Sequence, residues 1–173
     1  MKFNYTFISM LILLLIGSLG FAADANVSEL VVSPDWSIAW QFVDNNIEFT
    51  LMAPTTGWVS IGFNPTKMMK DAEYVLGYVQ DGKLVVRQDY GTGLFSHKPV
   101  VDLGRNQEIT EISGTQDNSV TTLVFRLPLH WGKDSGIEFT KGQSFKVLLA
   151  YGKDGSRNFT AKHSKKKVVT VTL

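Results

Sequence analysis

The segment GWVSIGFNPTKMMKDAEYVLGYVQDGKLVVRQDY, which runs from Gly57 to Tyr90, sets the fold class of this chain. It begins with the apolar run GWVSIGF, continues through a polar loop, and ends with two apolar runs on either side of Asp81-Gly82. Short runs of β-branched and aromatic residues bounded by turn residues are typical of strands, and Asp-Gly between two of them indicates a tight hairpin. The segment therefore predicts three successive strands, joined first by a loop and then by a hairpin turn.

The same pattern extends in both directions from this segment. Further apolar runs, separated by turn residues, are WSIAWQF, NNIEFTLMA, QEITEISGT, SVTTLVFRL, SFKVLLAYG and KVVTVTL. Short strands at regular spacing predict an all-β protein, and we expect a β-sandwich of about nine to eleven antiparallel strands. One helical turn near PLHWGKD, at residues 128–134, is the most helix that we expect after the N-terminal region.

The N-terminal region is typical of a secretory signal peptide. It has one basic residue, Lys2, then an apolar run from Phe7 to Leu19, then small residues that include Ala22, Ala23 and Ala25. An uncleaved anchor is the alternative, but the run is somewhat short for a span of about 20 residues. We expect a signal peptide at 1–25, one domain at 26–173, a secreted or periplasmic location, and no integral membrane segment after cleavage.

Charge and cysteine content exclude several classes of function. The chain has 17 basic and 16 acidic side chains, and loss of residues 1–25, which contain Lys2 and Asp24, leaves 16 and 15, so the two kinds are nearly balanced. This balance gives no electrostatic argument for binding nucleic acid or an anionic membrane, and the one basic run, Lys165 to Lys167, is typical of a solvated turn. Because the chain has no cysteine, a thiolate nucleophile, an iron–sulfur cluster and a blue-copper site are excluded.

No catalytic motif is evident in the sequence. There is no Gly-x-Ser-x-Gly elbow and no phosphate-binding loop, so we expect that the domain is not an enzyme by itself. Of the three histidines, His97 is expected to be a lone surface residue in a polar loop, and His130 to cap a turn beside Trp131. His163 precedes the last strand and is the candidate ligand.

The adjacent Met68 and Met69 stand in a polar loop, although methionine usually fills gaps in apolar cores. Met and His are the axial pair that raises the reduction potential of haem in electron-transfer cytochromes. Because there is no Cys-x-x-Cys-His, a covalently attached haem is excluded, and haem b is the predicted cofactor. A copper(I) carrier that uses Met68, Met69 and His163 is an alternative, since thioethers select Cu(I).

A carbohydrate-binding module is a further alternative. Such a module would use exposed tryptophan rings to stack on a sugar ligand, although the same rings fit core positions equally well. The four candidates are Trp36, Trp40, Trp58 and Trp131.

From Trp36 to Leu173 the chain resembles the DOMON domain. The resemblance is carried by GWVSIGF, by MKDAEYVLGYV, and by AYG followed by His163 before the last strand. It implies an immunoglobulin-like β-sandwich that, in cytochrome members such as that of cellobiose dehydrogenase, holds haem b between a Met and a His. By this resemblance the ligands are His163 and either Met69 or Met68, and Met69 is preferred because Lys70-Asp71-Ala72-Glu73 follows it directly.

The resemblance also implies a role in redox chemistry. The expected function is an exported haem b domain for single-electron transfer or redox sensing. Many members carry a redox partner, either a membrane cytochrome or a flavin dehydrogenase, in the same polypeptide. Because this sequence contains neither, we expect the partner to be another, unidentified protein.

Overall fold

The computed structural model describes residues 27–132 and 136–173, so the predicted signal peptide lies outside the described residues. The described chain is almost entirely β-structure, as predicted. Its elements are β1 (Ser28–Ser33), β2 (Trp36–Val43), β3 (Asn46–Ala53), β4 (Val59–Phe63), β5 (Glu73–Gln80), β6 (Lys83–Gly93), β7 (Ser96–Pro99), the 3-10 helix η1 (Val100–Leu103), β8 (Thr110–Asp117), β9 (Val120–Pro128), β10 (His130–Trp131), β11 (Ile137–Glu138), β12 (Ser144–Tyr151) and β13 (Lys165–Thr172). No helix in these two ranges is both long and apolar enough to span a membrane.

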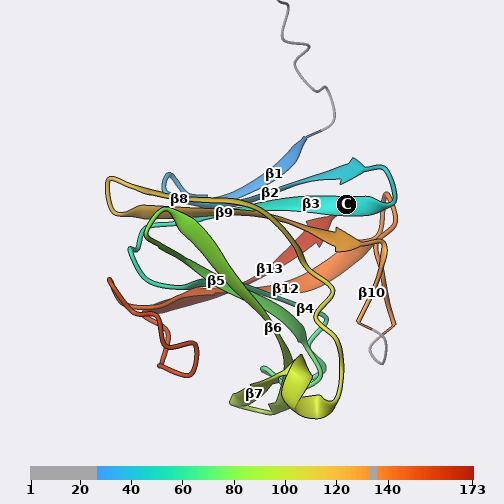
Figure 1. Ribbon diagram of the computed structural model, residues 1–173. Coiled ribbons are helices and arrows are strands. Elements are labelled where there is room, and N and C mark those ends of the chain that lie inside the picture. The colour runs from blue at the N-terminus through green and yellow to red at the C-terminus, as the bar shows by residue number, and fades with distance from the viewer. Residues whose placement is uncertain (1–26, 133–135) are drawn as a thin grey trace, which may run out of the picture.

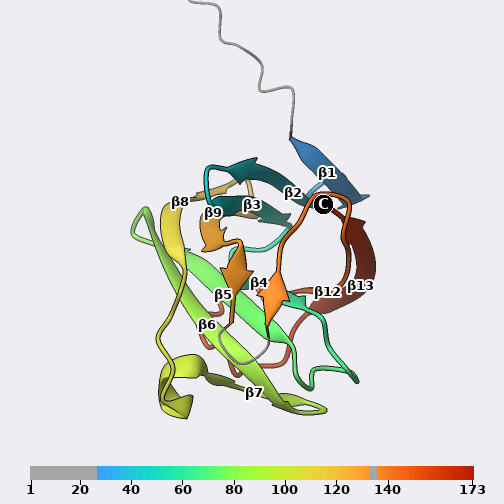
Figure 2. The ribbon, with the colours of Figure 1, turned by 90° about the vertical axis from the view of Figure 1, so that its right-hand side faces the viewer.

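Two antiparallel sheets face each other and form a β-sandwich (Figure 1). One has five strands in the order β1-β2-β3-β9-β8, and the other has six in the order β13-β12-β4-β5-β6-β7. The short hairpin of β10 and β11 lies beside one edge of the sandwich (Figure 2). The predicted β-sandwich is confirmed, and its two large sheets contain the eleven strands at the upper end of the expected range.

The observed turns agree only in part with the turns that the sequence predicts. Asp81 and Gly82 join β5 to β6 with φ angles of 51° and 71°, the left-handed pair that a two-residue hairpin requires. At most one helical turn was expected near Pro128, and in the described part of that segment His130 and Trp131 pair with β11 instead. The only helical turn in the described ranges is η1, which ends at Gly104 in the left-handed conformation.

Aromatic rings fill the space between the sheets. Phe63 from β4 contacts Phe49, Trp131 and Phe139, with ring centroids 5.3, 5.7 and 5.4 Å away. Strand β4 contributes every second residue to this core, namely Val59, Ile61 and Phe63. Because side chains already occupy the interior, a functional site is to be sought on an outer surface of the sandwich.

Candidate functional site

A second apolar cluster lies on the outer face of the six-stranded sheet. Its buried members are Trp58, Ala72, Tyr74, Leu76 and Phe159, and Met69, Tyr78, Leu148 and Ala150 pack against them. The strand residues among them alternate with residues that face the main core, so they occupy the opposite side of the sheet. An outer face that is both apolar and buried is the main departure of this sheet from a simple two-layer sandwich.

Two loops contribute to this cluster, and we name them by their predicted ligands. The Met loop (residues 64–72) joins β4 to β5, and the His loop (residues 152–164) joins β12 to β13. Strand β12 runs antiparallel to β4, with Tyr151 opposite Val59 and Val147 opposite Phe63. The two loops therefore leave the sheet at opposite ends of β4, with the outer-face cluster between them.

The two methionines have different environments. Met68 has a φ of 55° and is 43% exposed, whereas Met69 is half-buried and packs against the outer-face cluster. A left-handed φ is uncommon for a residue with a long side chain and is a local source of strain. The backbone turn at Met68 thus leaves its own side chain in solvent while Met69 packs on the sheet.

Backbone hydrogen bonds fasten the Met loop to β6 and to the turn that follows it. Met69 donates its N–H to the carbonyl of Leu94 at 3.2 Å, and Asp71 donates to Gly91 at 2.8 Å. Gly91 in turn donates to Ala72 at 2.8 Å. A Cβ atom on Gly91 would lie 1.8 Å from the carbonyl oxygen of Met69, so only glycine allows this approach.

The side chain of Asp71 organises the same loop. It accepts hydrogen bonds from the hydroxyl of Thr66 at 2.5 Å and from that of Tyr90 at 3.2 Å. The Thr66 hydrogen bond, and to a lesser extent the charge of Lys70, lower the pKa of Asp71. Sequence analysis did not single out Asp71, Thr66, Tyr90 or Gly91 as residues that support Met69.

The His loop is anchored at its beginning and at its end. Trp58 accepts a backbone hydrogen bond from Gly152 at 2.8 Å and donates one to Ser156 at 2.9 Å. At the other end, Ser164 donates to the carbonyl of Tyr151 at 2.7 Å. His163 immediately precedes this closing bond, so its backbone position is fixed relative to the end of β12.

The imidazole of His163 is held toward its neutral form. Burial lowers its pKa below 6.5, and the positive charges of Lys166 and Lys162 act in the same direction. Neutral imidazole is the form that can coordinate a metal. Among the described residues, no three His, Asp or Glu side chains cluster as a metal site.

The outer-face cluster has properties that fit a flat, apolar cofactor with acidic groups. Phe159 from the His loop lies 5.3 Å from the ring of Tyr78, between centroids, and carries the guanidinium of Arg87 over its face at 4.8 Å. Trp58 is 4% exposed, and its indole N–H has no hydrogen-bond partner. The indole N–H groups of Trp40 and Trp131 in the main core are likewise unpaired, so this feature does not by itself indicate a ligand.

His97 is not the lone surface residue that the sequence suggested. It lies on β7 with a side chain only 14% exposed, and its Nδ1 pairs with Asp89, whose side chain is fully buried. Arg87 donates two further hydrogen bonds to Asp89, at 2.6 and 2.7 Å. Although burial raises the pKa of Asp89, the hydrogen bonds from His97 and Arg87 lower it more, so this carboxylate is charged.

This charged cluster borders the apolar one. The ring of His97 lies 5.7 Å from that of Tyr74, between centroids. The hydroxyl of Tyr74 donates to the carbonyl of Met69 at 3.3 Å. No local pattern predicts the contact between His97 and Tyr74, because it joins residues of β7 and β5.

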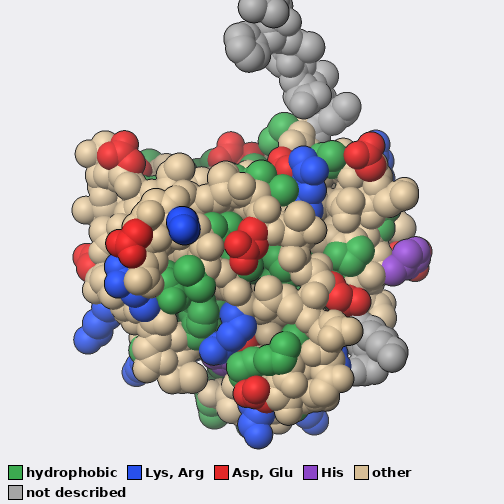
Figure 3. All heavy atoms as spheres, in the orientation of Figure 1, with side chains coloured by type: hydrophobic (Ala, Val, Ile, Leu, Met, Phe, Trp, Pro, Cys, Tyr) green, Lys and Arg blue, Asp and Glu red, His purple; other side chains and the backbone are tan. Residues whose placement is uncertain are grey.

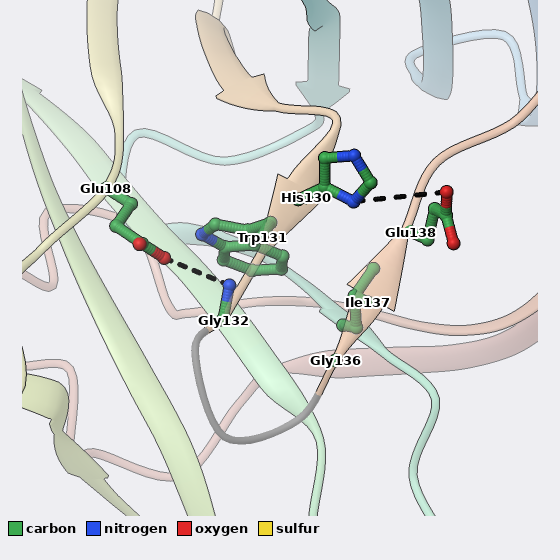
Figure 4. Close-up of a pocket in the computed structure, with 7 residues that line it drawn as sticks. All are labelled: Glu108, His130, Trp131, Gly132, Gly136, Ile137 and Glu138. Carbon is green, nitrogen blue, oxygen red and sulfur yellow. Dashed lines mark hydrogen bonds and ion pairs between the residues drawn. The ribbon is translucent and has the colours of Figure 1, made fainter.

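A separate pocket lies at the β10–β11 hairpin (Figure 4). Glu108 accepts a hydrogen bond from the backbone N–H of Gly132 at 2.9 Å, while Nδ1 of His130 is 3.9 Å from Glu138. The side chain of His130 is 83% exposed. Neither Met69 nor His163 lines this pocket.

All four tryptophans proposed as sugar platforms are buried. Exposed fractions are 8% for Trp36, 6% for Trp40, 4% for Trp58 and 1% for Trp131. None of them offers an open ring face to a sugar at the surface. The carbohydrate alternative therefore loses the residues on which it depended.

Sequence comparison places the chain in a known family. The DOMON domain family model matches residues 33–152. MOXD1 homolog 2 of Drosophila melanogaster is 30% identical over 98 residues, which is 57% of this chain and 13% of that protein. DOMON domain-containing protein FRRS1L of Mus musculus is 27% identical over 105 residues, which is 60% of this chain and 34% of that protein. The chain thus spans about a third or less of these relatives.

Solved structures with the same fold include two cytochrome domains. The cytochrome b domain of pyranose dehydrogenase from Coprinopsis cinerea has a TM-score of 0.60 and 14% identity, with 80% of this chain and 76% of that chain covered. The cytochrome domain of Myriococcum thermophilum cellobiose dehydrogenase has a TM-score of 0.57 and 14% identity, with 86% and 82% covered. At this identity the likeness shows a shared fold. Together with the match over residues 33–152, the β-sandwich described above shows that the chain belongs to the DOMON domain family.

Proposed function

We propose that this domain binds one haem b on the outer face of its six-stranded sheet, with Met69 and His163 as axial ligands, and that it passes single electrons. The observation that carries the proposal is the position of Met69, half-buried on an apolar cluster to which the His loop also contributes. Support also comes from the solved structures of the same fold, two of which are cytochrome domains. When bound, haem b would supply an iron that exchanges one electron reversibly.

Each part of the site has a distinct role in this proposal. The partly buried members of the outer-face cluster, Tyr78, Leu148 and Ala150, would give the macrocycle an apolar surface. The thioether of Met69 would raise the reduction potential, and His163 would bind as neutral imidazole. Met68, which is 43% exposed, has no direct role.

The proposal describes an exported electron carrier or redox sensor rather than an enzyme. With two side chains as axial ligands, the iron would offer no open position to a substrate. Export rests on the signal-like sequence at residues 1–25. The redox partner is proposed to be a separate protein.

Absorbance spectroscopy tests the proposal directly. The protein, purified and supplied with hemin, is expected to keep a Soret band through gel filtration and to show sharp low-spin bands when reduced. A double variant, Met69→Ala with His163→Ala, is the control for nonspecific hemin uptake. Protein that leaves the column colourless contradicts the proposal, and elemental analysis that finds copper in place of iron favours the Cu(I) alternative.

A further inference from the structure

Positive charge is concentrated on the His loop and on the start of β13. Residues 153–167 contain six basic side chains and one acidic side chain, whereas the rest of the chain after residue 25 contains ten basic and fourteen acidic side chains. The six cations are Lys153, Arg157, Lys162, Lys165, Lys166 and Lys167. On β13, Lys166 pairs with Ala150 of the outer-face cluster, whereas Lys165 and Lys167 pair with Tyr151 and Leu149, which belong to the side of the main core. We therefore call Lys153, Arg157, Lys162 and Lys166 the cationic face. Figure 3 shows Lys and Arg side chains gathered at the lower left, where the loop between β12 and β13 lies in Figure 1.

These cations are not used within the described part of the fold. All six are exposed, and no carboxylate in residues 27–132 or 136–173 forms an ion pair with any of them. The one acidic residue among them, Asp154, accepts a hydrogen bond from the backbone N–H of Thr56 at 2.9 Å. The face therefore presents its charge to the solvent.

A structural explanation accounts for the three lysines of β13, of which only Lys166 belongs to the cationic face. The expected solvated turn at Lys165 to Lys167 is wrong, because these residues begin β13, the edge strand of the six-stranded sheet. Lysines on an edge strand prevent edge-to-edge pairing between sheets. Lys153, Arg157 and Lys162 lie in the His loop, where no strand edge needs protection.

Two members of the cationic face lie close to the proposed haem ligand. Lys162 is adjacent to His163 in sequence, and Lys166 is close enough for its charge to act on the imidazole. A concentrated charge on a chain with almost no excess charge steers an oppositely charged partner to one orientation and raises its rate of association by about 10- to 1,000-fold. On this chain, that orientation would bring the partner to the His163 side of the site.

We propose that the cationic face is the docking surface for the acidic face of a redox partner protein, which would exchange electrons with the haem beside His163. The proposal rests on the proposed haem function for its electron transfer, and on the charge distribution alone for its binding. The expected partner is a protein whose own redox centre is surrounded by Asp and Glu side chains.

The test compares two charge-matched variants. The face variant is Lys153→Glu, Arg157→Glu, which leaves untouched Lys162 and Lys166, the two lysines that act on His163. The control variant is Lys98→Glu, Lys146→Glu, whose sites are also exposed but lie toward the end of the sheet that carries the Met loop. Both variants change the net charge by the same amount.

Two readouts separate docking from haem binding. The first is fluorescence anisotropy of a labelled peptide of ten glutamates with haem-free protein, at low and high salt. The second is stopped-flow electron transfer from a reduced acidic flavodoxin to the haem-loaded protein, with the reduction potential measured for each variant. We expect the face variant to lose about 10-fold in both peptide affinity and second-order rate at low salt, with the control within about two-fold of the unmodified protein.

Each contrary outcome has a separate meaning. If the unmodified protein takes up no hemin, the proposed function fails, and the peptide binding still decides whether this face docks acidic partners. Equal losses in the two variants, or no loss in either, overturn the docking proposal and leave the haem untouched. Loss of haem from the face variant alone assigns the cations to the propionates instead. Binding to phosphatidylserine vesicles, but to neither the peptide nor the flavodoxin, assigns them to a membrane surface.

Discussion

Gly91 and Met69 are in direct backbone contact: a Cβ atom added to Gly91 would lie 1.8 Å from the carbonyl oxygen of Met69. Because the obstacle is backbone and not a movable side chain, Gly91→Ala must displace the Met loop. We expect it to lower the free energy of unfolding by about 1–3 kcal/mol and to weaken the low-spin haem spectrum. Gly93→Ala is the matched control, since its Cβ would meet only the hydroxyl of Ser96, which can rotate away. Equal effects of the two substitutions would show that the Met loop does not depend on this contact.

The two methionines should respond differently to truncation. Met69→Ala is expected to open the sixth position of the iron, so the spectrum turns high-spin and the reduction potential falls. Met68→Ala should keep the low-spin spectrum and change the free energy of unfolding by less than about 0.5 kcal/mol, because Met68 is 43% exposed. Visible spectra and potentiometry check both variants. A reversed result moves the ligand to Met68 and leaves the haem proposal intact.

His163→Ala is expected to abolish tight haem retention, and acid should do the same to the unmodified protein. Protons compete with iron for the imidazole, and burial lowers the pKa of His163 below 6.5. Hemin affinity should therefore be constant at pH values above 6.5 and fall only as the pH drops through the lowered pKa. A hemin titration from pH 8 to pH 5 measures this, and a decline that starts between pH 8 and 7 argues against His163 as the ligand.

His97→Ala should destabilise the fold. It removes one of the two side chains that donate hydrogen bonds to the fully buried Asp89, and a buried carboxylate that loses a hydrogen bond costs about 1–3 kcal/mol. His130→Ala should have an effect of less than about 0.5 kcal/mol, since the side chain of His130 is 83% exposed. Urea unfolding of the haem-free variants gives both values. Similar values for the two variants would show that the Asp89 pair contributes little.

Asp71→Asn should lower stability in a pH-dependent way. The pKa of Asp71 is lowered below 3.8, chiefly by the Thr66 hydrogen bond, so folding favours the charged carboxylate. Its contribution is full above pH 3.8 and is lost as the pH falls through the lowered folded-state pKa. Thermal unfolding of both proteins should give different melting temperatures at pH 6 and converging ones below pH 3.8. A constant difference across this range would assign the effect to shape rather than to charge.

The sequence predicted those features that depend on neighbouring residues. Asp81-Gly82 forms its hairpin because both residues tolerate the left-handed conformation. Within GWVSIGF, the residues VSIGF form β4, and their alternation puts Val59, Ile61 and Phe63 on the core face. Alternation did place Trp58 on the face opposite Val59. It could not show that Trp58 would be 4% exposed, because the loops that cover it come from distant parts of the chain.

The features that sequence analysis missed are contacts between distant segments. His97 reaches Asp89 because β7 pairs with β6, a pairing with an irregular register that no local pattern specifies. Gly91 was one glycine among 15 in the chain, and nothing local distinguished it until the Met loop was seen to lie on it. The charge of Lys165 to Lys167 was evident, but its edge-strand position depends on the order of strands in the sheet.

The length of strand β4 sets the distance between the two loops of the site. Its five residues separate the bases of the Met loop and the His loop by about 13 Å, at about 3.3 Å per residue. Inserting one residue would invert the strand and exchange Trp58 and Gly62 with the core side chains of Val59 and Phe63. Inserting two would restore the faces but carry the loop bases about 7 Å further apart. The loop sequences around Met69 and His163 can therefore change freely. A change in the number of residues in β4, by contrast, would alter either the faces of the sheet or the spacing between the bases of the two loops.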